Sequence, residues 1–225
     1  MASVRWLRRS ARTTKPNAAT CSCCNSIRRG SPLTDAPLLG AVLTGGASTR
    51  MGRTKALVDV AGVPMALRVA DALSGAGCTS VALIGGDPGR LAPLGLPVVP
   101  DLDPGGGPLA GIVTALDAFG HVEPGTGWVF VAACDLASLT SSAVEPLIRA
   151  ARGAETADVV VARTDRVEPG CALWRRDRIE TVSALYDGGI RAVHGALDAL
   201  EVVEVTVSAE ALRNINTPDD LGRYP

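Results

Sequence analysis

The sequence lacks the marks of several large protein classes. Histidine occurs only as His121 and His194, and neither stands in a recognisable catalytic setting. No apolar run is long enough to span a membrane, so we expect no membrane partner. Basic and acidic residues nearly balance, 22 against 23, which gives no case for a general nucleic-acid-binding protein.

Cysteine spacing excludes two further classes. Of the six cysteines, three lie near the N-terminus with no histidine nearby to complete a tetrahedral metal site. The other three, Cys78, Cys134 and Cys171, are scattered through apolar segments. This spacing fits neither a zinc ribbon nor a small disulfide scaffold. We therefore expect buried free thiols in a cytoplasmic protein, because the cytosol is reducing.

Acidic residues are absent from the first thirty positions, which contain many arginines. This stretch also lacks the long apolar centre of a secretory signal. A targeting peptide, a nucleic-acid-binding arm and a later start of translation are alternatives, but the composition favours a disordered extension. We predict a basic extension over residues 1–36 and one domain over residues 37–225, since 47% apolar residues suffice for one sizeable core.

Short apolar runs alternate with helical patterns from residue 37 onward, which predicts an α/β fold with a mostly parallel sheet between two layers of helices. We therefore expect a single Rossmann-like three-layer domain. The expected strands cover residues 38–43, 81–84, 98–99, 128–134, 159–162 and 202–207. Helical spacing of apolar residues appears over residues 65–73, 109–116, 144–148 and 179–186. A capping box at Ser142 and Glu145 predicts one helix start, and Thr217 and Pro218 predict the start of a final helix.

A glycine-rich loop follows directly after the first expected strand. Gly45 and Gly46 allow backbone N–H groups to approach phosphate oxygens, and Arg50 and Lys55 add positive charge. A Walker A loop is excluded because five residues separate Gly46 from Gly52, and no lysine follows Gly52. The dinucleotide fingerprint is also absent. The loop therefore predicts binding of a polyphosphate.

Two carboxylates follow other expected strands. Asp135 comes directly after the apolar run 128–134, and Asp101 precedes a triple glycine and a helix start at Pro108. In a parallel sheet, ligands bind beyond the carboxyl ends of the strands. Asp135 could cap the next turn, but beside a triphosphate a magnesium ligand is the better interpretation, since Mg²⁺ takes one or two carboxylates plus phosphate oxygens and water.

These motifs together resemble those of the molybdenum cofactor guanylyltransferases. The resemblance covers residues 38–222 and is carried, in the family's order, by Leu43 to Lys55, Gly107 to Gly111, Cys134-Asp135 and Asn214 to Asp220. It implies the fold of the nucleotide-diphospho-sugar transferases. It also implies nucleotide-binding roles for Leu43, Gly45, Gly46, Lys55, Asp101 and Asp135, with Asp135 as the magnesium ligand.

The implied reaction transfers GMP from GTP to molybdopterin and releases pyrophosphate. The attacking phosphate is already anionic near neutral pH, so no general base is needed, and catalysis would rest on Arg50, Lys55 and Asp135. On the acceptor side, the resemblance implies roles for Arg191, Asn214 and Asn216. It further implies transient contacts with a molybdenum-insertion protein and with acceptor apo-enzymes.

Three departures from the family pattern keep alternatives open. Leu136-Ala137 replaces a small residue and proline, Gly85-Gly86-Asp87 replaces a segment with a nucleotide-contacting asparagine, and Ala192 replaces a second arginine. A molybdenum cofactor cytidylyltransferase, another small nucleotidyltransferase such as a sugar-1-phosphate enzyme, and a catalytically silent nucleotide-binding adaptor are the alternative functions.

Overall fold

The computed structural model describes residues 37–45, 54–122, 127–215 and 220. The expected extension over residues 1–36 lies outside these ranges, so the division into 1–36 and 37–225 stays a prediction. The expected helix start at Thr217 and Pro218 also lies outside them. None of the helices in the described ranges combines the length and hydropathy that crossing a bilayer demands.

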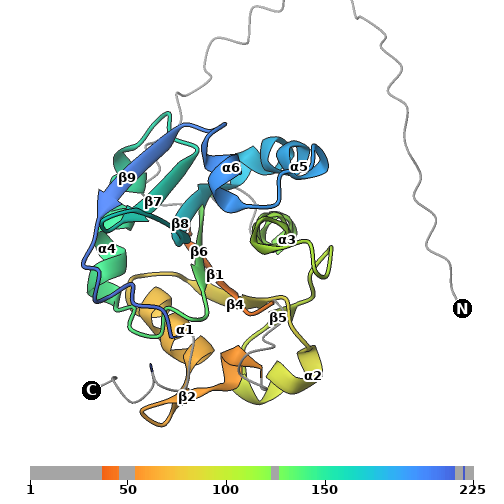
Figure 1. Cartoon of the computed structure of the whole chain (residues 1–225), viewed down its shortest axis with the longest axis vertical. Helices are drawn as coiled ribbons and strands as arrows, with labels where there is room; N and C mark the ends of the chain where they lie inside the picture. The colour runs from red at the N-terminus through yellow and green to blue at the C-terminus, as the bar shows by residue number, and fades with distance from the viewer. Residues whose placement is uncertain (1–36, 46–53, 123–126, 216–219, 221–225) are drawn as a thin grey trace, which may run out of the picture. The chain divides into compact units, whose positions relative to one another are not determined.

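A seven-stranded sheet forms the centre of the fold, with the strand order β5-β4-β1-β6-β8-β7-β9 (Figure 1). Neighbouring strands pair in parallel except at β8, which runs antiparallel to both β6 and β7. The expected mostly parallel sheet is therefore confirmed. The strands are β1 (Leu39–Leu43), β4 (Ser80–Ile84), β5 (Val98–Val99), β6 (Trp128–Ala133), β7 (Val159–Arg163), β8 (Val167–Arg175) and β9 (Val202–Thr206).

All six expected strands are present, but the sequence analysis missed β8. Its first half contains Pro169 and Gly170, which are typical of loops rather than strands. The register explains how they are accommodated, because β7 residues Val161 and Ala162 pair with Ala172 and Glu168 and so skip three residues of β8. Pro169 lies in this irregularity, where no ladder hydrogen bond to β7 is required of it.

A second, two-stranded sheet was also missed. It joins β2 (Asp59–Val60) to β3 (Val63–Pro64). Ala61 and Gly62 form the turn, both with positive φ, 50° and 79°. The two strands are only two residues long each, too short to show an alternating pattern.

Helices cover both faces of the large sheet (Figure 1). On one face, α1 (Met65–Gly75) and α4 (Ser141–Gly153) contact each other and the sheet. On the other, α3 (Pro108–Val122) packs on β1 and β6, with α5 (Ile179–Asp187) and α6 (Val193–Leu197) beside it. The three-layer prediction is confirmed. Shorter helical turns are η1 (Lys55–Leu57), α2 (Pro88–Leu91), η2 (Ala92–Leu94) and η3 (Arg176–Arg178).

The expected capping box at Ser142 was wrong. The N-cap of α4 is Thr140, whose side chain accepts a hydrogen bond from the backbone N–H of Ala143 at 3.3 Å. Thr140 has the extended backbone of a cap, whereas Ser142 already lies in the first turn and shares a hydrogen bond with the Thr140 hydroxyl. Two hydroxyl residues near one helix start made the sequence ambiguous.

The expected buried thiols are confirmed for Cys78, Cys134 and Cys171, which are all free. Burial raises the pKa of each thiol to about 12. These sulfurs therefore stay protonated at neutral pH and pack as small apolar groups.

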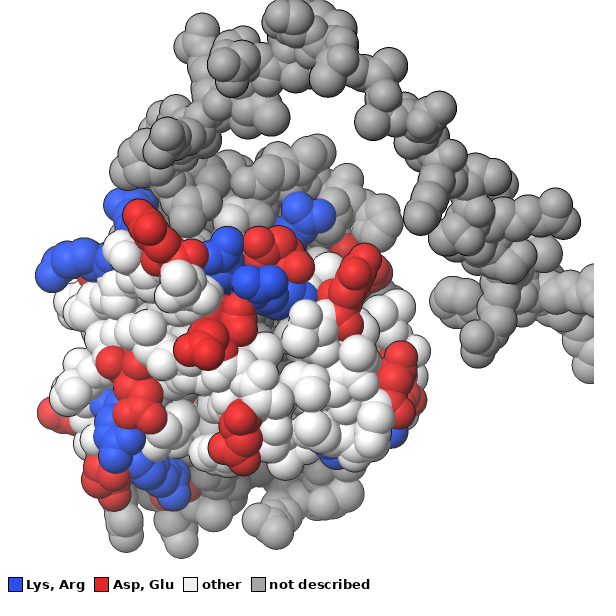
Figure 2. Space-filling view, turned by 90° about the horizontal axis from the view of Figure 1, so that it is seen from above, with Lys and Arg blue, Asp and Glu red and all other residues white. Residues whose placement is uncertain are grey.

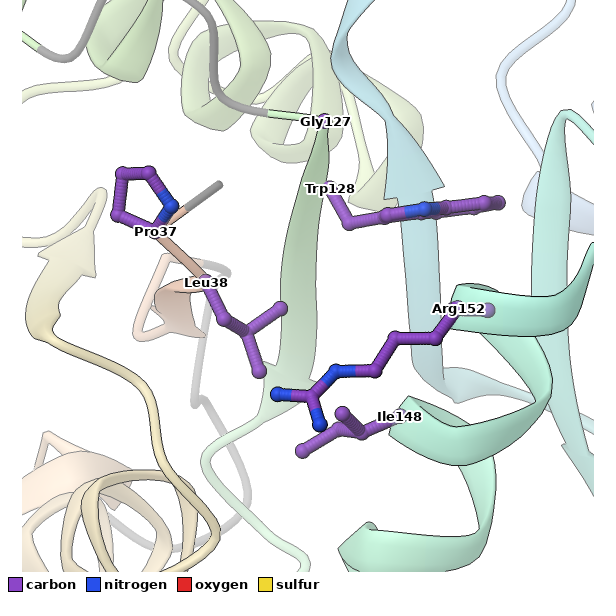
Figure 3. Close-up of a pocket in the computed structure, with 7 residues that line it drawn as sticks. Pro37, Leu38, Gly127, Trp128, Ile148 and Arg152 are labelled. Atoms are coloured by element: carbon purple, nitrogen blue, oxygen red, sulfur yellow. The ribbon is translucent and has the colours of Figure 1, made fainter. Parts of the chain in front are cut away.

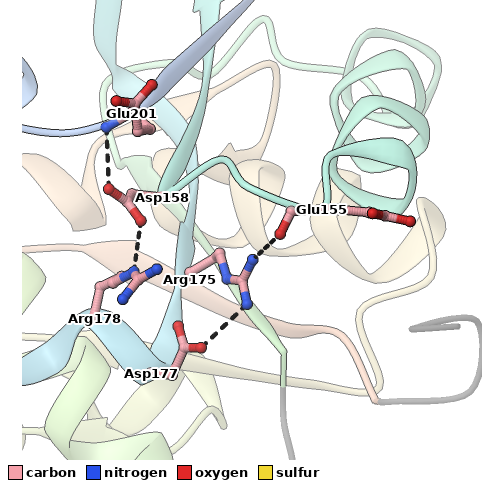
Figure 4. A network of polar contacts seen from close by, with 6 residues as sticks. All are labelled: Glu155, Asp158, Arg175, Asp177, Arg178 and Glu201. Atoms are coloured by element: carbon pink, nitrogen blue, oxygen red, sulfur yellow. Dashed lines mark hydrogen bonds and ion pairs between the residues drawn. The ribbon is translucent and has the colours of Figure 1, made fainter. Parts of the chain in front are cut away.

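Charged residues tie β7, β8 and β9 together at their ends (Figure 4). Asp158, 9% exposed, accepts hydrogen bonds from Arg178 Nε at 2.5 Å and from the backbone N–H of Glu201 at 3.0 Å. Arg175 donates to the carbonyl of Glu155 at 2.7 Å and to Asp177 at 3.1 Å. Asp158 thus links the chain before β7 to the chain before β9.

We expect Asp158→Ala to lower the free energy of unfolding by roughly 1–2 kcal/mol, because it removes both acceptors from a partly buried site. Urea unfolding would measure this loss. Glu155→Ala is the matched control, since the carbonyl of Glu155, not its carboxylate, accepts the hydrogen bond from Arg175. Equal stability of the two variants would contradict this role of Asp158.

Candidate active site

The carboxyl ends of β4, β1 and β6 lie side by side in the sheet. From β1 the chain continues to β4 on one side and later returns to β6 on the other. The strand order therefore reverses between β1 and β6, and ligands of open α/β sheets bind at such a point. A hollow that Leu38, Trp128 and Arg152 help to line lies at the opposite, amino ends of β1 and β6 (Figure 3).

Thr44 fixes the start of the glycine-rich loop. Its side chain is 6% exposed, and its hydroxyl lies 3.1 Å from the carbonyl oxygen of Ile84 and donates to that of Gly85 at 2.8 Å. The backbone N–H groups of Thr44 and Gly45 also point to the Ile84 carbonyl, at 2.8 and 3.2 Å. The end of β1 is thereby fastened to the end of β4. Sequence reasoning passed over Thr44, because a threonine after a strand carries no distinct signal.

Lys55 and Asp135 meet at the end of β6. The Lys55 Nζ lies 2.8 Å from Asp135 Oδ2, and the two side chains are 19% and 23% exposed. Eighty residues separate them in the sequence. The pair brings together the cation predicted for phosphate binding and the carboxylate predicted, beside that phosphate, for metal binding. Asp135 does not cap α4, since Thr140 does so.

The segment before residue 216 contacts the backbone of Asp135. The backbone N–H of Ile215 donates to the carbonyl of Asp135 at 3.0 Å, and Ile215 is 1% exposed in a small cluster with Met65 and Ala137. Asn214, the preceding residue, is therefore held next to Asp135 in space. The predicted residues Gly46, Arg50 and Asn216 lie outside the described residues.

Leu43 contributes through its backbone and through helix packing. Its carbonyl accepts a hydrogen bond from the backbone N–H of Cys134 at 3.1 Å, which aligns the ends of β1 and β6. A Cβ at Gly111 of α3 would lie 3.2 Å from Leu43 Cδ2. Gly111 thus lets α3 approach the end of β1 closely, and Leu43 is half-buried beneath it.

Leu136 and Ala137, which follow Asp135 and replace the small residue and proline of the family pattern, pack into the core. Leu136 and Ala137 are 3% and 1% exposed. The Ala137 carbonyl accepts a hydrogen bond from Arg68 Nε at 3.0 Å, and the Leu136 backbone N–H donates to Ala133 at 3.2 Å. Burial and these hydrogen bonds hold the loop where the family pattern has proline.

Asp101 reaches over the ends of two neighbouring strands. Its Oδ2 would lie 2.6 Å from a Cβ at Gly45, and it would collide with a Cβ at Gly85. Gly45 follows β1 and Gly85 follows β4, so both glycines leave room for this carboxylate. Burial, and then the charge of Asp103, raise the pKa of Asp101. A hydrogen-bond donor on a ligand would stabilise the charged form.

Gly85 stands where the family pattern has a segment with asparagine, and its geometry explains the glycine. Its φ of +77° is unfavourable for residues with a side chain, and the Asp101 carboxylate fills the space of a Cβ. The sequence analysis identified residues 85–87 as a departure from the family pattern, but it could not identify Asp101 as the residue that fills the space beside Gly85.

We expect Gly85→Ala to weaken nucleotide binding by about tenfold or more, because the new methyl group must displace Asp101. Isothermal titration calorimetry with GTP would measure the change. Gly95→Ala is the matched control, since Gly95 has a similar φ of +71° but no atom within 4 Å of its Cβ position. It shares the backbone strain without the collision, so equal losses in both variants would contradict the role of Asp101.

Arg191 lies in a separate group of contacts. Its guanidinium stacks over the Tyr186 ring, 4.0 Å from the ring centre, and donates to the Tyr186 carbonyl at 2.5 Å. The Arg191 carbonyl faces Gly107 at the start of α3, 3.6 Å from the Cβ position there. The structure thus brings Lys55 and Asp135 together, with Asn214 next to the Ile215 that contacts Asp135, but it groups Arg191 with the loop before α3.

Comparisons with known proteins agree with this arrangement. The MobA-like NTP transferase domain model matches residues 40–202. A molybdenum cofactor guanylyltransferase of Rhodobacter capsulatus is 33% identical over 188 residues, which are 83% of this chain and 94% of the relative.

Solved structures give the same result for the fold. Molybdopterin-guanine dinucleotide biosynthesis protein A of Archaeoglobus fulgidus is 27% identical with a TM-score of 0.67, over 82% of this chain and 95% of that one. A manganese complex of a Mycobacterium tuberculosis H37Rv protein shares the fold at 16% identity and a TM-score of 0.62, over 84% and 98% of the two chains. The expected nucleotidyltransferase fold is confirmed. The chain belongs to the MobA-like NTP transferase family and, within it, to the molybdenum cofactor guanylyltransferases.

Proposed function

We propose that this nucleotidyltransferase transfers GMP from GTP to molybdopterin and releases pyrophosphate. The observation that carries the proposal is the Lys55–Asp135 pair, with its 2.8 Å contact at the carboxyl end of β6. The pair adjoins the point where the strand order reverses, in a chain 33% identical to a molybdenum cofactor guanylyltransferase.

The chemistry asks for alignment and charge neutralisation rather than proton transfer. The attacking phosphate oxygen of the acceptor is anionic near neutral pH, so no side chain need remove a proton. The enzyme must hold two polyanions in line and stabilise the departing pyrophosphate. We assign Lys55 and Arg50 to the leaving phosphates and the backbone of Gly46 to the triphosphate. Gly45, whose own N–H donates to the Ile84 carbonyl, contributes to the nucleotide site by leaving room for Asp101.

We assign Asp135 as the protein ligand of a magnesium ion. Within the described residues, no three or more His, Cys, Asp or Glu side chains are grouped so that they could hold a metal ion by themselves. A partly exposed single carboxylate fits Mg²⁺, which keeps several waters and takes phosphate oxygens from its nucleotide. The ion would supply positive charge to the pyrophosphate as it leaves. Manganese in a protein of the same fold supports a divalent cation.

The remaining substrate contacts fall on other residues. Asp101, whose carboxylate lies against Gly45 and Gly85, is proposed to contact the nucleotide. Arg191, Asn214 and Asn216 are proposed for the acceptor from the family resemblance, and for Asn214 the neighbouring contact between Ile215 and Asp135 supports the assignment. Arg191 offers a cation for a phosphate at the loop before α3.

The cellular setting belongs to the same proposal. Three buried free cysteines support a cytoplasmic location, where thiols stay reduced. The acceptor is a reactive cofactor, so hand-over from a molybdenum-insertion protein and to acceptor apo-enzymes is proposed as transient contact.

A screen of nucleotides and acceptors with Mg²⁺ tests the function. We expect pyrophosphate release and a product of the mass of the molybdopterin guanine dinucleotide only with GTP and molybdopterin together. A product formed from CTP instead would favour the cytidylyltransferase alternative. Transfer to a sugar 1-phosphate would favour another nucleotidyltransferase, and binding without metal-dependent turnover would favour the adaptor.

A further inference from the structure

Tyr186 joins two loops that the proposed function assigns to different substrates. Its hydroxyl donates a hydrogen bond to the carboxylate of Asp103, in the loop between β5 and α3. The guanidinium of Arg191 stacks over its ring, 4.0 Å from the ring centre. Tyr186 lies in the last turn of α5, which packs beside α3 (Figure 1).

The loop between β5 and α3 leaves room for the Tyr186 hydroxyl at Gly106. A Cβ at Gly106 would collide with this hydroxyl and would lie 2.8 Å from the Cβ of Ala110. The Gly106 backbone N–H donates to the carbonyl of Asp103 at 3.0 Å, which closes the turn. Glycine at position 106 therefore allows Tyr186 to reach Asp103.

The same loop carries Asp101 and is fastened on both sides of it. Before Asp101, the Val99 carbonyl accepts a hydrogen bond from Gly85 at 2.8 Å. After it, the Leu102 backbone N–H donates to the Thr114 hydroxyl at 3.1 Å. The bond from Tyr186 to Asp103 holds the next residue, so it limits how far the loop can shift Asp101 away from Gly45 and Gly85.

We infer that Tyr186 is a positioning residue that holds Asp101 for the nucleotide through the Asp103 loop and holds Arg191 for the acceptor phosphate through its ring. The inference rests on the proposed function for the roles of Asp101 and Arg191. The hydroxyl of Tyr186 acts on Asp103, and the ring acts on Arg191. Removing the hydroxyl should therefore affect the nucleotide alone, whereas removing the ring should affect both substrates.

The contacts of Tyr186 with Asp103 and Arg191 lie at the surface, where polar pairs contribute little to the free energy of unfolding. A substitution that breaks them should leave the melting temperature nearly unchanged. A merely structural role would instead lower the melting temperature and leave the KM values of the two substrates in their original ratio.

Tyr186→Phe and Tyr186→Leu in the full chain test the inference. For Tyr186→Phe we expect the Kd of GTP, measured by calorimetry, to rise roughly fivefold, which is the scale of one lost hydrogen bond. The KM of molybdopterin should stay unchanged, because the ring still supports Arg191. For Tyr186→Leu both values should rise.

Asp103 provides the matched controls. Asp103→Asn keeps an acceptor for the hydroxyl and should bind GTP nearly as the wild type does, whereas Asp103→Ala should reproduce Tyr186→Phe. The double variant Tyr186→Phe with Asp103→Ala should be no weaker than either single variant, because both remove one contact. Additive losses would contradict the shared contact.

The phenol of Tyr186 gives a readout that does not depend on turnover. The hydrogen bond to Asp103 raises the pKa of Tyr186. The chain has two tyrosines, so a Tyr224→Phe background leaves one phenol to follow by ultraviolet absorbance. Asp103→Ala should lower the pKa toward the ordinary value, and an unchanged titration would overturn the contact.

The outcomes separate the inference from the function on which it rests. Wild-type affinity for GTP in Tyr186→Phe would overturn the positioning role alone. Failure of the wild-type chain to bind GTP would overturn the proposed function and the positioning role with it.

Discussion

Lys55→Ala is expected to lower kcat by about a hundredfold or more, because loss of one donor aimed at developing charge typically costs about 3 kcal/mol of transition-state stabilisation. Lys55 lies 2.8 Å from Asp135 and begins η1 just after the glycine-rich loop. Its ammonium group is thus held where the departing phosphates are proposed to lie. Pyrophosphate release with saturating GTP, Mg²⁺ and molybdopterin would measure the loss.

The fold should survive this substitution. Both side chains of the pair are partly exposed, 19% and 23%, so the remaining Asp135 stays hydrated and the free energy of unfolding changes little. Arg163→Ala is a matched control, because it removes a cation from another ion pair, 2.6 Å from Glu204, on β7 and β9. We expect full activity from it. Lys55→Ala with near wild-type kcat would refute the assignment of Lys55.

Asp135→Asn is expected to reduce turnover by a similar factor of about a hundred, for a different reason. The amide keeps the shape of the side chain and can still accept a hydrogen bond from Lys55, but it loses the negative charge that attracts a divalent cation. The variant should fold normally, since Ile215 binds the carbonyl of residue 135 and not its side chain.

Binding of the metal ion to Asp135 can be measured independently of turnover. Manganese binding to the wild type in the presence of GTP, measured by electron paramagnetic resonance, should weaken in Asp135→Asn. Glu204→Gln is the control, since it neutralises a carboxylate paired with Arg163 at the surface. Unchanged manganese affinity together with unchanged kcat in Asp135→Asn would exclude Asp135 as the metal ligand.

Strands could be predicted where their apolar residues are continuous. The runs that became β1, β6 and β7 are buried on both faces, so each appears in the sequence as an uninterrupted apolar segment. β8 was missed because Pro169 and Gly170 interrupt its pattern, and only the irregular pairing with β7 makes them compatible with a strand.

The candidate site was predicted unevenly for a related reason. Lys55 closes a recognisable glycine-rich loop, and Asp135 follows a continuous apolar strand, so both could be chosen from the sequence once the loop predicted a triphosphate. Thr44, Gly85 and Tyr186 act through partners that are distant in sequence, and no local pattern reveals such partners. Gly85 was visible as a departure from the family, but the Asp101 carboxylate that occupies its side-chain space was not.

By itself, the sequence determined the α/β class and, through motifs that resemble those of the family, the family. It also predicted polyphosphate binding by the loop, because burial, glycine turns and spaced charges leave local patterns. The tertiary structure alone decided which of these parts meet. The parallel pairing of β1 with β6 brought Lys55 to Asp135 across 80 residues, and the packing of α5 beside α3 brought Tyr186 to Asp103 across 83. Distances between such partners are set by sheet order and helix packing, which single-residue patterns do not encode.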